Sequence, residues 1–170
     1  MGFLFSCCNP RDEIDPIQKV GNTKLIDPYA PRSIRIILCG TATVGKTALI
    51  TVYSKGHFNE NHEPTVLDIF RGEKELDGRP LEIEVIDTSG DDMLGAHRTL
   101  VYDNADCFML CVSADNRDSF ERINYFKNEI KLKCPNVPIL LVATKYDTRE
   151  GCDDPVRKEE LEEEKTRHGF

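Results

Sequence analysis

One stretch of the chain has residue types and a spacing that suit phosphate binding. Residues 40–47 match the pattern G-x-x-x-x-G-K-[ST]. In this pattern backbone N–H groups and a helix N-terminus surround the phosphates. The lysine adds positive charge at the β- and γ-phosphates, and the last hydroxyl is available to Mg²⁺. We therefore predict a phosphate-binding loop, or P-loop, made of Gly40, Thr41, Ala42, Thr43, Val44, Gly45, Lys46, Thr47 and, in the helix that follows, Ala48.

A second polar motif, Asp87-Thr88-Ser89-Gly90, follows an apolar segment. A carboxylate at the end of a strand can hold Mg²⁺ as a Walker-B aspartate does, so Asp87 is a predicted metal ligand together with Thr47. Gly90 has no side chain, so its backbone N–H can approach a γ-phosphate. Taken alone, the motif is equally well explained as a polar turn after a strand. Its position behind a P-loop favours nucleotide binding.

A third motif, Thr144-Lys145-Tyr146-Asp147, also follows an apolar run. A carboxylate can accept two parallel N–H bonds from the edge of guanine, which adenine does not offer. Asp147 is therefore expected to select guanine, Lys145 to cover the base and ribose, and Thr144 to complete the site. By itself the motif is equally a polar turn. Its place after the other two motifs favours a guanine nucleotide over ATP.

The hydrophobic pattern predicts the elements that position these motifs. Strands are expected at residues 33–39, 66–76, 81–86, 106–112 and 138–143. Asp77-Gly78 joins the second and third of them in a hairpin. Helices are expected at 46–54 and 119–133, followed by a solvated acidic helix that starts at Asp154-Pro155. This order predicts an α/β fold of the P-loop NTPase class, a mostly parallel sheet with helices on both faces.

The order of the three motifs resembles that of the Ras superfamily of small GTPases, and three further segments resemble its Rho branch. Residues 63–68 are similar to the first switch of that branch, and residues 134–138 and the charged helix near the end, which resembles the Rho insert, also fit. The resemblance covers residues 33–170. It implies Mg²⁺ and GTP or GDP as ligands, with Thr65 as a further metal ligand and Phe58 edge-on against the guanine. Switch segments near 59–70 and 90–99 would contact Rho-type effectors and regulators.

Three residues depart from the family where catalysis takes place. Asp91 stands at the position of the glutamine that orients the attacking water, and aspartate is shorter and has no N–H to donate. Ala42 replaces a glycine of the P-loop, and Ser89 replaces the usual alanine. Together these changes resemble the GTPase-deficient Rnd-like members. We expect slow or absent hydrolysis, with Asp91 ineffective at the catalytic position. The alternative is that another residue orients the water.

The resemblance runs to Phe170, where the family continues with a further strand and helix. We therefore expect an incomplete small GTPase domain over residues 33–170, with the last strand and last helix missing. The competing interpretation is a pseudo-GTPase scaffold, or a truncated fragment, with weak or no nucleotide binding. Retention of Lys46, Thr47, Thr65 and Asp87 favours the switch that binds nucleotide.

The first 32 residues contain a lipidation pattern. The start of the chain fits M-G-x-x-x-[ST], in which Gly2 receives a myristoyl group. One such chain anchors a protein only marginally, so palmitoyl groups on Cys7 and Cys8 would supply the second signal. This predicts an N-terminal extension over residues 1–32 that tethers the protein to the cytoplasmic face of a membrane, the plasma membrane. An unmodified terminus is the alternative.

The composition limits the classes of function. The chain has 22 basic and 30 acidic side chains, a net charge of −8, which argues against a nucleic-acid binder. It contains no apolar run near the length that crosses a bilayer. The seven cysteines lack the spacing of a zinc site or a disulfide framework, which indicates a reducing compartment.

Overall fold

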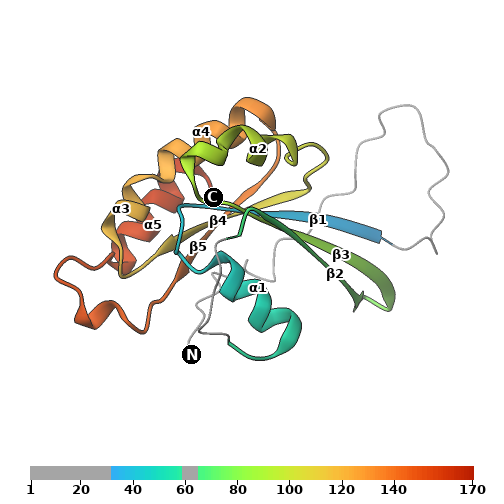
Figure 1. Cartoon of the computed structure of the whole chain (residues 1–170), viewed down its shortest axis with the longest axis horizontal. Helices are drawn as coiled ribbons and strands as arrows, with labels where there is room; N and C mark the ends of the chain where they lie inside the picture. Colours follow the sequence, from blue (N-terminus) through green and yellow to red (C-terminus); the bar gives the residue numbers. More distant parts are fainter. Residues whose placement is uncertain (1–31, 59–64) are drawn as a thin grey trace.

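The computed structural model of the chain describes residues 32–58 and 65–170, which form an α/β domain around one sheet (Figure 1). The strand order is β2-β3-β1-β4-β5. Of the five strands described, only β2 is antiparallel to its neighbour, and β2 and β5 form the edges. The predicted mostly parallel sheet is confirmed. The bounds are β1 Arg32–Cys39, β2 Leu67–Leu76, β3 Arg79–Thr88, β4 Cys107–Ser113 and β5 Ile139–Thr144.

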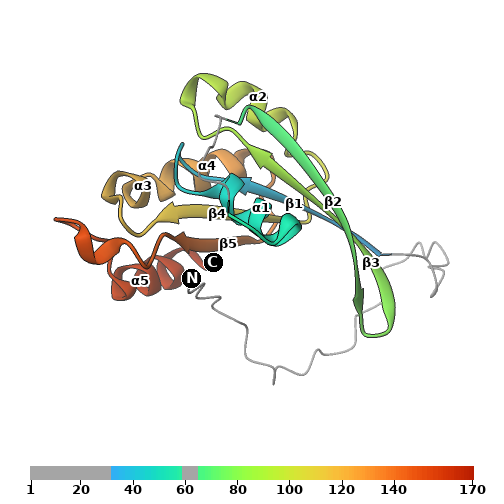
Figure 2. The same cartoon turned by 60° about the horizontal axis from the view of Figure 1, so that its bottom comes forward.

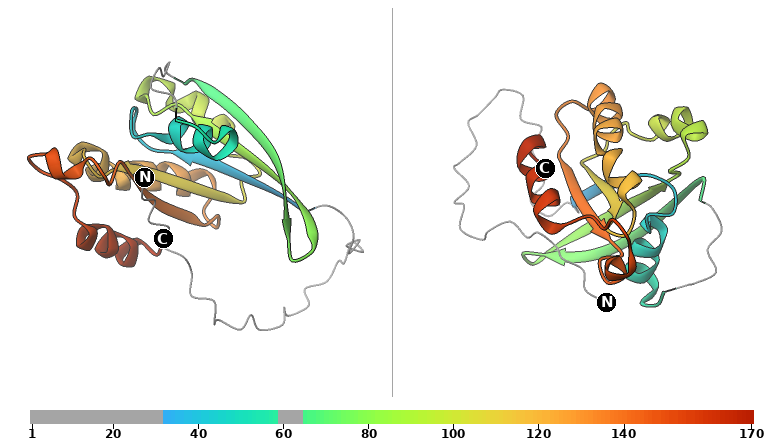
Figure 3. Two further views of the ribbon diagram at one scale, coloured as in Figure 1. Left: turned by 90° about the horizontal axis from the view of Figure 1, so that it is seen from below. Right: turned by 90° about the vertical axis from the view of Figure 1, so that its left-hand side faces the viewer.

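Helices cover both faces of the sheet, as predicted. Figure 2 shows α1 in front of the strands with α4 behind them, and the right-hand view of Figure 3 shows the sheet between α1 and the pair α2 and α4. The helix α5 is joined to α3 by the ion pair Arg117–Glu160, 2.8 Å. The bounds are α1 Lys46–Lys55, α2 Gly95–Leu100, α3 Arg117–Glu121, α4 Ile123–Lys133 and α5 Lys158–His168.

The central strand β1 separates two apolar clusters. Successive side chains of a strand point to opposite faces. Ile37 therefore belongs to the cluster under α4, with Phe108 and Phe126, whereas Leu38 belongs to the cluster under α1, with Ile50. Full burial of such a side chain stabilises the fold by about 1.5–3 kcal/mol. The strand that leads into the P-loop is thus held by apolar contacts on both sides.

Most expected elements are present, with bounds within two residues of the prediction. The Asp77-Gly78 turn is confirmed, because both residues have positive φ, 52° and 72°, as a tight hairpin requires. The helix expected at 119–133 is divided at Arg122 into α3 and α4. The short helix α2 was not predicted, because six residues are too few to show a helical period.

The acidic helix differs from the prediction at its start. α5 begins at Lys158, three residues after Pro155, and its N-cap is Arg157. The backbone N–H of Arg157 donates to the carboxylate of Glu160 at 2.9 Å, which forms one half of a capping box. The predicted start at Asp154-Pro155 is wrong because the chain is still extended at the N-cap.

The acidic helix also differs in its environment. Val156, just before it, is fully buried, and its N–H donates to the carbonyl oxygen of Ala114 at 2.9 Å. Leu161 packs against the main core. The helix therefore packs on the domain. The prediction of a simply solvated helix is wrong. None of the helices in the described residues has the length and apolar character needed to cross a bilayer.

Candidate nucleotide-binding site

The predicted P-loop connects β1 to α1, and two glycines shape it. Gly40 has φ 130° and Gly45 has φ 93°, values that residues with a side chain rarely adopt. A Cβ on Gly40 would lie 2.2 Å from the carbonyl oxygen of Cys111 in β4. The backbone of the loop thus approaches the neighbouring strand too closely for any other residue. Ala48 lies in the first turn of the helix that follows, α1.

The side chain of Lys46 is held inside this loop. The residue is 6% exposed, and its Nζ donates to the carbonyl oxygens of Gly40 at 2.9 Å and Thr41 at 2.8 Å. Burial lowers the pKa of Lys46, and the negative charge of Asp87 opposes that shift. An anionic phosphate at the loop would offset the cost of burying this cation.

Three side chains predicted as metal ligands meet next to the P-loop. Thr47 Oγ1 lies 2.9 Å from Thr65 Oγ1 and donates to the buried carboxylate of Asp87. Thr47 and Asp87 come together because β1 and β3 are parallel neighbours whose carboxyl ends lie side by side, and Thr65 precedes β2, which begins opposite the end of β3. One carboxylate and two hydroxyls are oxygen donors of the kind that Mg²⁺ accepts, so these residues fit that ion. The described residues contain no cluster of three or more His, Cys, Asp or Glu that could hold a metal.

Gly90 packs directly on the P-loop. A Cβ at this position would lie 2.2 Å from the backbone nitrogen of Ala42 and 2.2 Å from the carbonyl carbon of Thr41. The Asp87–Gly90 motif therefore borders the loop at two points, through the carboxylate of Asp87 and through the backbone at Gly90. A side chain at position 90 would push the two segments apart.

The third motif is connected to the P-loop through its threonine. Thr144 Oγ1 hydrogen-bonds to the carbonyl oxygen of Val44 and, at 3.0 Å, to that of Val112. Lys145, with φ 53°, and Asp147 are exposed at the end of β5, where a ligand can reach them. The structure thus places the predicted base-recognition residues beside the predicted phosphate loop.

The remaining predicted residues are less closely connected to this group. Phe58 follows the end of α1 and is 51% exposed, and its contact with a base stays a prediction. The lipidation sites Gly2, Cys7 and Cys8 and residues 59–64 of the expected first switch lie outside the described residues.

Asp91, at the predicted catalytic position, caps a short helix. Its carboxylate accepts the backbone N–H of Met93 at 2.9 Å, at the start of the 3₁₀ helix η1 (Asp92–Leu94). Asp92 pairs with Arg122, and the hydrogen bond from Arg122 lowers the pKa of Asp92. The two carboxylates after Gly90 thus stabilise the local structure of this segment.

Sequence reasoning missed a buried arginine behind the same segment. The side chain of Arg98 in α2 is fully buried and forms a two-pronged ion pair with Glu129 of α4, at 2.9 and 2.6 Å. Its Nη1 also donates to the carbonyl oxygens of Ser89 at 2.9 Å and Asp91 at 3.2 Å. The one signal in the sequence is that Glu129 adjoins the apolar stripe of the helix.

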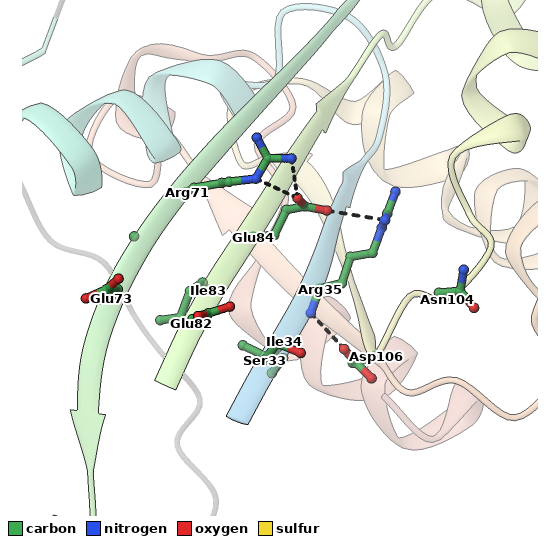
Figure 4. A pocket seen from close by; sticks show the side chains of 11 residues that line it. Ser33, Ile34, Arg35, Arg71, Glu73, Glu82, Ile83, Glu84, Asn104 and Asp106 are labelled. Atoms are coloured by element: carbon green, nitrogen blue, oxygen red, sulfur yellow. Dashed lines mark hydrogen bonds and ion pairs between the residues drawn. The ribbon is translucent and has the colours of Figure 1, made fainter. Parts of the chain in front are cut away.

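A groove of about 760 Å³ lies elsewhere on the sheet, at the amino-terminal halves of β1 and β3 (Figure 4). Four of its charged residues are joined by ion pairs and a hydrogen bond. Glu84 binds both Arg71 at 2.7 Å and Arg35 at 3.3 Å, and Asp106 accepts the backbone N–H of Arg35 at 2.7 Å. Because the P-loop leaves the opposite end of β1, this groove is separate from the candidate site.

The similarities to known proteins agree with this geometry. Residues 35–170 match the Ras family. The Rho-related GTP-binding protein RhoB of human, mouse and rat is in each case 39% identical to the chain over 126 residues, 74% of this chain. The chain spans 63% of the length of these relatives. Since the family match covers most of the chain and these relatives are Rho proteins, the chain belongs to the Ras family of small GTPases, in the Rho branch.

Proposed function

We propose that this chain binds GTP or GDP with Mg²⁺ and acts as a signalling switch of the Rho type. The observation that carries the proposal is the meeting of Thr47, Thr65 and Asp87 beside the buried Lys46. These groups come from separate segments of the chain, and they match what a nucleotide phosphate with its metal ion requires. The names of the relatives also describe GTP-binding proteins.

Each group of site residues would bind a different part of the nucleotide. Lys46 and the backbone N–H groups of the P-loop would hold the β- and γ-phosphates, and Gly90 would offer its N–H to the γ-phosphate. The carboxylate of Asp147 would accept the guanine N–H groups, with Lys145 over the ring and Phe58 at its edge. Thr47, Thr65 and Asp87 would hold Mg²⁺, which would supply positive charge to offset that of the phosphates.

Hydrolysis in this proposal is slow. The carboxylate of Asp91 accepts the N–H of Met93 and has no N–H of its own with which to orient a water molecule. A negative charge near an anionic phosphate is also unfavourable. Ala42, whose backbone Gly90 approaches, also carries a Cβ where the family has glycine. An arginine finger is worth about 10³–10⁵ in rate and would need this same space.

The membrane and the partners complete the proposed function. Lipids on Gly2, Cys7 and Cys8 would hold the switch at the cytoplasmic face of the plasma membrane. Effectors and regulators would bind the switch segments, where several apolar side chains are exposed. These are Val66 just before β2, Leu67 and Ile69 within it, and Met93 after β3.

The nucleotide content of the purified protein tests the proposal. We expect close to one guanine nucleotide per chain after denaturation and chromatography. Asp147→Ala should lower that content strongly, because it removes the guanine acceptor. Asp154→Ala, an exposed aspartate between β5 and α5, is the matched control and should leave it unchanged. Protein that carries no nucleotide and does not take up added GDP would instead support the scaffold interpretation.

A further inference from the structure

The turn formed by Ser89, Gly90 and Asp91 lies between two fixed structures. On one side it presses on the P-loop, where a Cβ on Gly90 would come within 2.2 Å of the backbone at Ala42. On the other side the carbonyl oxygens of Ser89 and Asp91, which flank Gly90, accept hydrogen bonds from Arg98 at 2.9 and 3.2 Å. The position of this turn is therefore determined by a side chain that lies outside every motif of the site.

Arg98 is itself held rigidly. Its two-pronged pairing with Glu129 uses the fork of the guanidinium, which fixes orientation as well as position. The guanidinium also lies 4.9 Å from the ring centre of Phe126. Burial alone would lower the pKa of Arg98, but the hydrogen bonds and charge of Glu129 hold it above its ordinary value, so the group stays charged.

The same network reaches the start of the P-loop. The hydroxyl of Tyr102 donates to Glu129 at 2.6 Å and lies 3.2 Å from the sulfur of Cys39, the last residue of β1. The ring of Tyr102 is fully buried and packs edge-on against Phe108. Glu129 is thus supported by a second donor, and the ion pair is anchored to the strand that carries the loop.

Because the peptide group is planar, the hydrogen bond from Arg98 to the Ser89 carbonyl also fixes the direction of the Gly90 N–H. The carbonyl of Ser89 and the N–H of Gly90 belong to one planar trans peptide group, so they point in opposite directions. When Arg98 holds that carbonyl, the N–H of Gly90 is aimed away from Arg98. Without the hydrogen bond from Arg98, the Ser89–Gly90 peptide group could rotate, and the direction of the Gly90 N–H would no longer be fixed.

We propose that Arg98 is a positioning residue that aims the Gly90 N–H at the γ-phosphate and so sets the preference of the site for GTP over GDP. The inference rests on the proposed nucleotide binding. Contacts that GDP also makes, through Lys46, Thr47 and Asp147, do not involve this turn. Loss of the arginine fork should therefore weaken GTP binding selectively.

The test compares Arg98→Lys with the control Arg117→Lys. Arg117 also pairs with two carboxylates and donates to a backbone carbonyl, but it does so between α3 and α5. Affinities for GDP and for a non-hydrolysable GTP analogue are measured with Mg²⁺ present. For Arg98→Lys we expect about a tenfold loss for the GTP analogue, the effect of one lost hydrogen bond to a charged group, and less than about a twofold change for GDP. Arg117→Lys should change neither by more than about twofold. Equal losses for both nucleotides, or no loss, would overturn the proposal.

A second variant and a second readout cover the case in which Arg98→Lys folds poorly. Tyr102→Phe keeps the packed ring and removes the hydroxyl that donates to Glu129 and contacts Cys39, so a smaller loss of about threefold is expected, again only for the GTP analogue. Amide hydrogen exchange of residues 88–94 should be faster in both variants and unchanged in Arg117→Lys. If the parent protein binds no nucleotide, the proposed function fails, and this exchange still decides the positioning role. Exchange at the parent rate in both variants would rule that role out.

Discussion

The P-loop and the turn after β3 touch at Gly90, yet different interactions hold them in place. Backbone conformation shapes the P-loop, through the positive φ of Gly40 and Gly45 and the contact with β4. A buried ion pair between Arg98 and Glu129, 31 residues apart in the chain, holds the turn after β3. The glycines of the first arrangement lie within eight consecutive residues, whereas the second exists only when α2 and α4 are packed together.

The difference indicates which of the two segments a single substitution can release. A loop shaped by its own backbone is disturbed mainly by changes within it. A turn held by one arginine depends on residues in α2 and α4 that contact no ligand. The following predictions test this contrast, from the largest expected effect to the smallest.

Removal of the partner of Arg98 should have the largest effect on stability. Glu129→Ala leaves a buried guanidinium without its carboxylate, which is expected to lower the free energy of unfolding by about 3–5 kcal/mol. Asp154→Ala removes an exposed partner of Arg117 and should lower it by less than about 1 kcal/mol. Denaturant unfolding followed by circular dichroism measures both. Equal losses in the two variants would contradict a special role for the buried pair.

A side chain at the contact between the two segments should have the next largest effect. Gly90→Ala places a methyl group 2.2 Å from the P-loop backbone, so one segment must move, at a cost of about 1–3 kcal/mol. Gly72→Ala in β2 is the control, because a Cβ there meets nothing within 4 Å. Thermal unfolding should separate the two variants clearly. A Gly90→Ala protein as stable as the control would show that the contact is loose.

The catalytic position should respond in two opposite ways. Asp91→Gln supplies an amide that can orient water and is expected to raise single-turnover GTP hydrolysis about tenfold. It also removes the carboxylate that caps η1, which should lower the unfolding free energy by about 1 kcal/mol. Asp92→Asn is the control and should leave the hydrolysis rate unchanged. A parent protein that already hydrolyses GTP at a rate typical of the family, with strong acceleration by a Rho GAP, would remove the basis of this prediction.

The smallest expected effect is the pH dependence of the Asp92–Arg122 pair. Because the pKa of Asp92 is lower in the folded chain than in the unfolded chain, the pair stabilises the fold above the ordinary aspartate pKa. That contribution is lost as the pH falls through the lowered pKa. The side chain of Asp92 is 56% exposed, so the contribution stays below about 1 kcal/mol. Stability curves of the parent and Asp92→Asn should differ at neutral pH and converge in acid.

The predictable parts of the molecule are those encoded locally. The P-loop, the hairpin at Asp77-Gly78 and the alternating strands follow from short patterns, and the structure contains all of them. The start of α5 could not be predicted in the same way. Asp154-Pro155 has the residues of a helix start, but the backbone hydrogen bond from Val156 to Ala114 keeps the chain extended there. Tertiary contacts overrode the local preference.

The candidate site shows the same division. Its motifs indicated that Thr47 and Asp87 meet, the family resemblance added Thr65, and the three side chains do meet beside the P-loop. The sequence shows that Asp91 replaces the family's glutamine. That its carboxylate caps η1 depends on how the backbone turns after Gly90. Arg98 belongs to no sequence motif, because its partner Glu129 is brought to it by the packing of α4 against α2.

The position of β1 also has a mechanical consequence. This strand begins at Arg32, directly after the segment proposed to carry lipids, and it is paired with β3 from Arg32 to Leu38 and with β4 from Ile36 to Cys39. Tension on a membrane tether would enter β1 end-on and load the hydrogen bonds of both parallel ladders in shear, many at once. The loop at the far end of the same strand would thus be shielded from such a pull, and the domain could bear load while its site kept its shape.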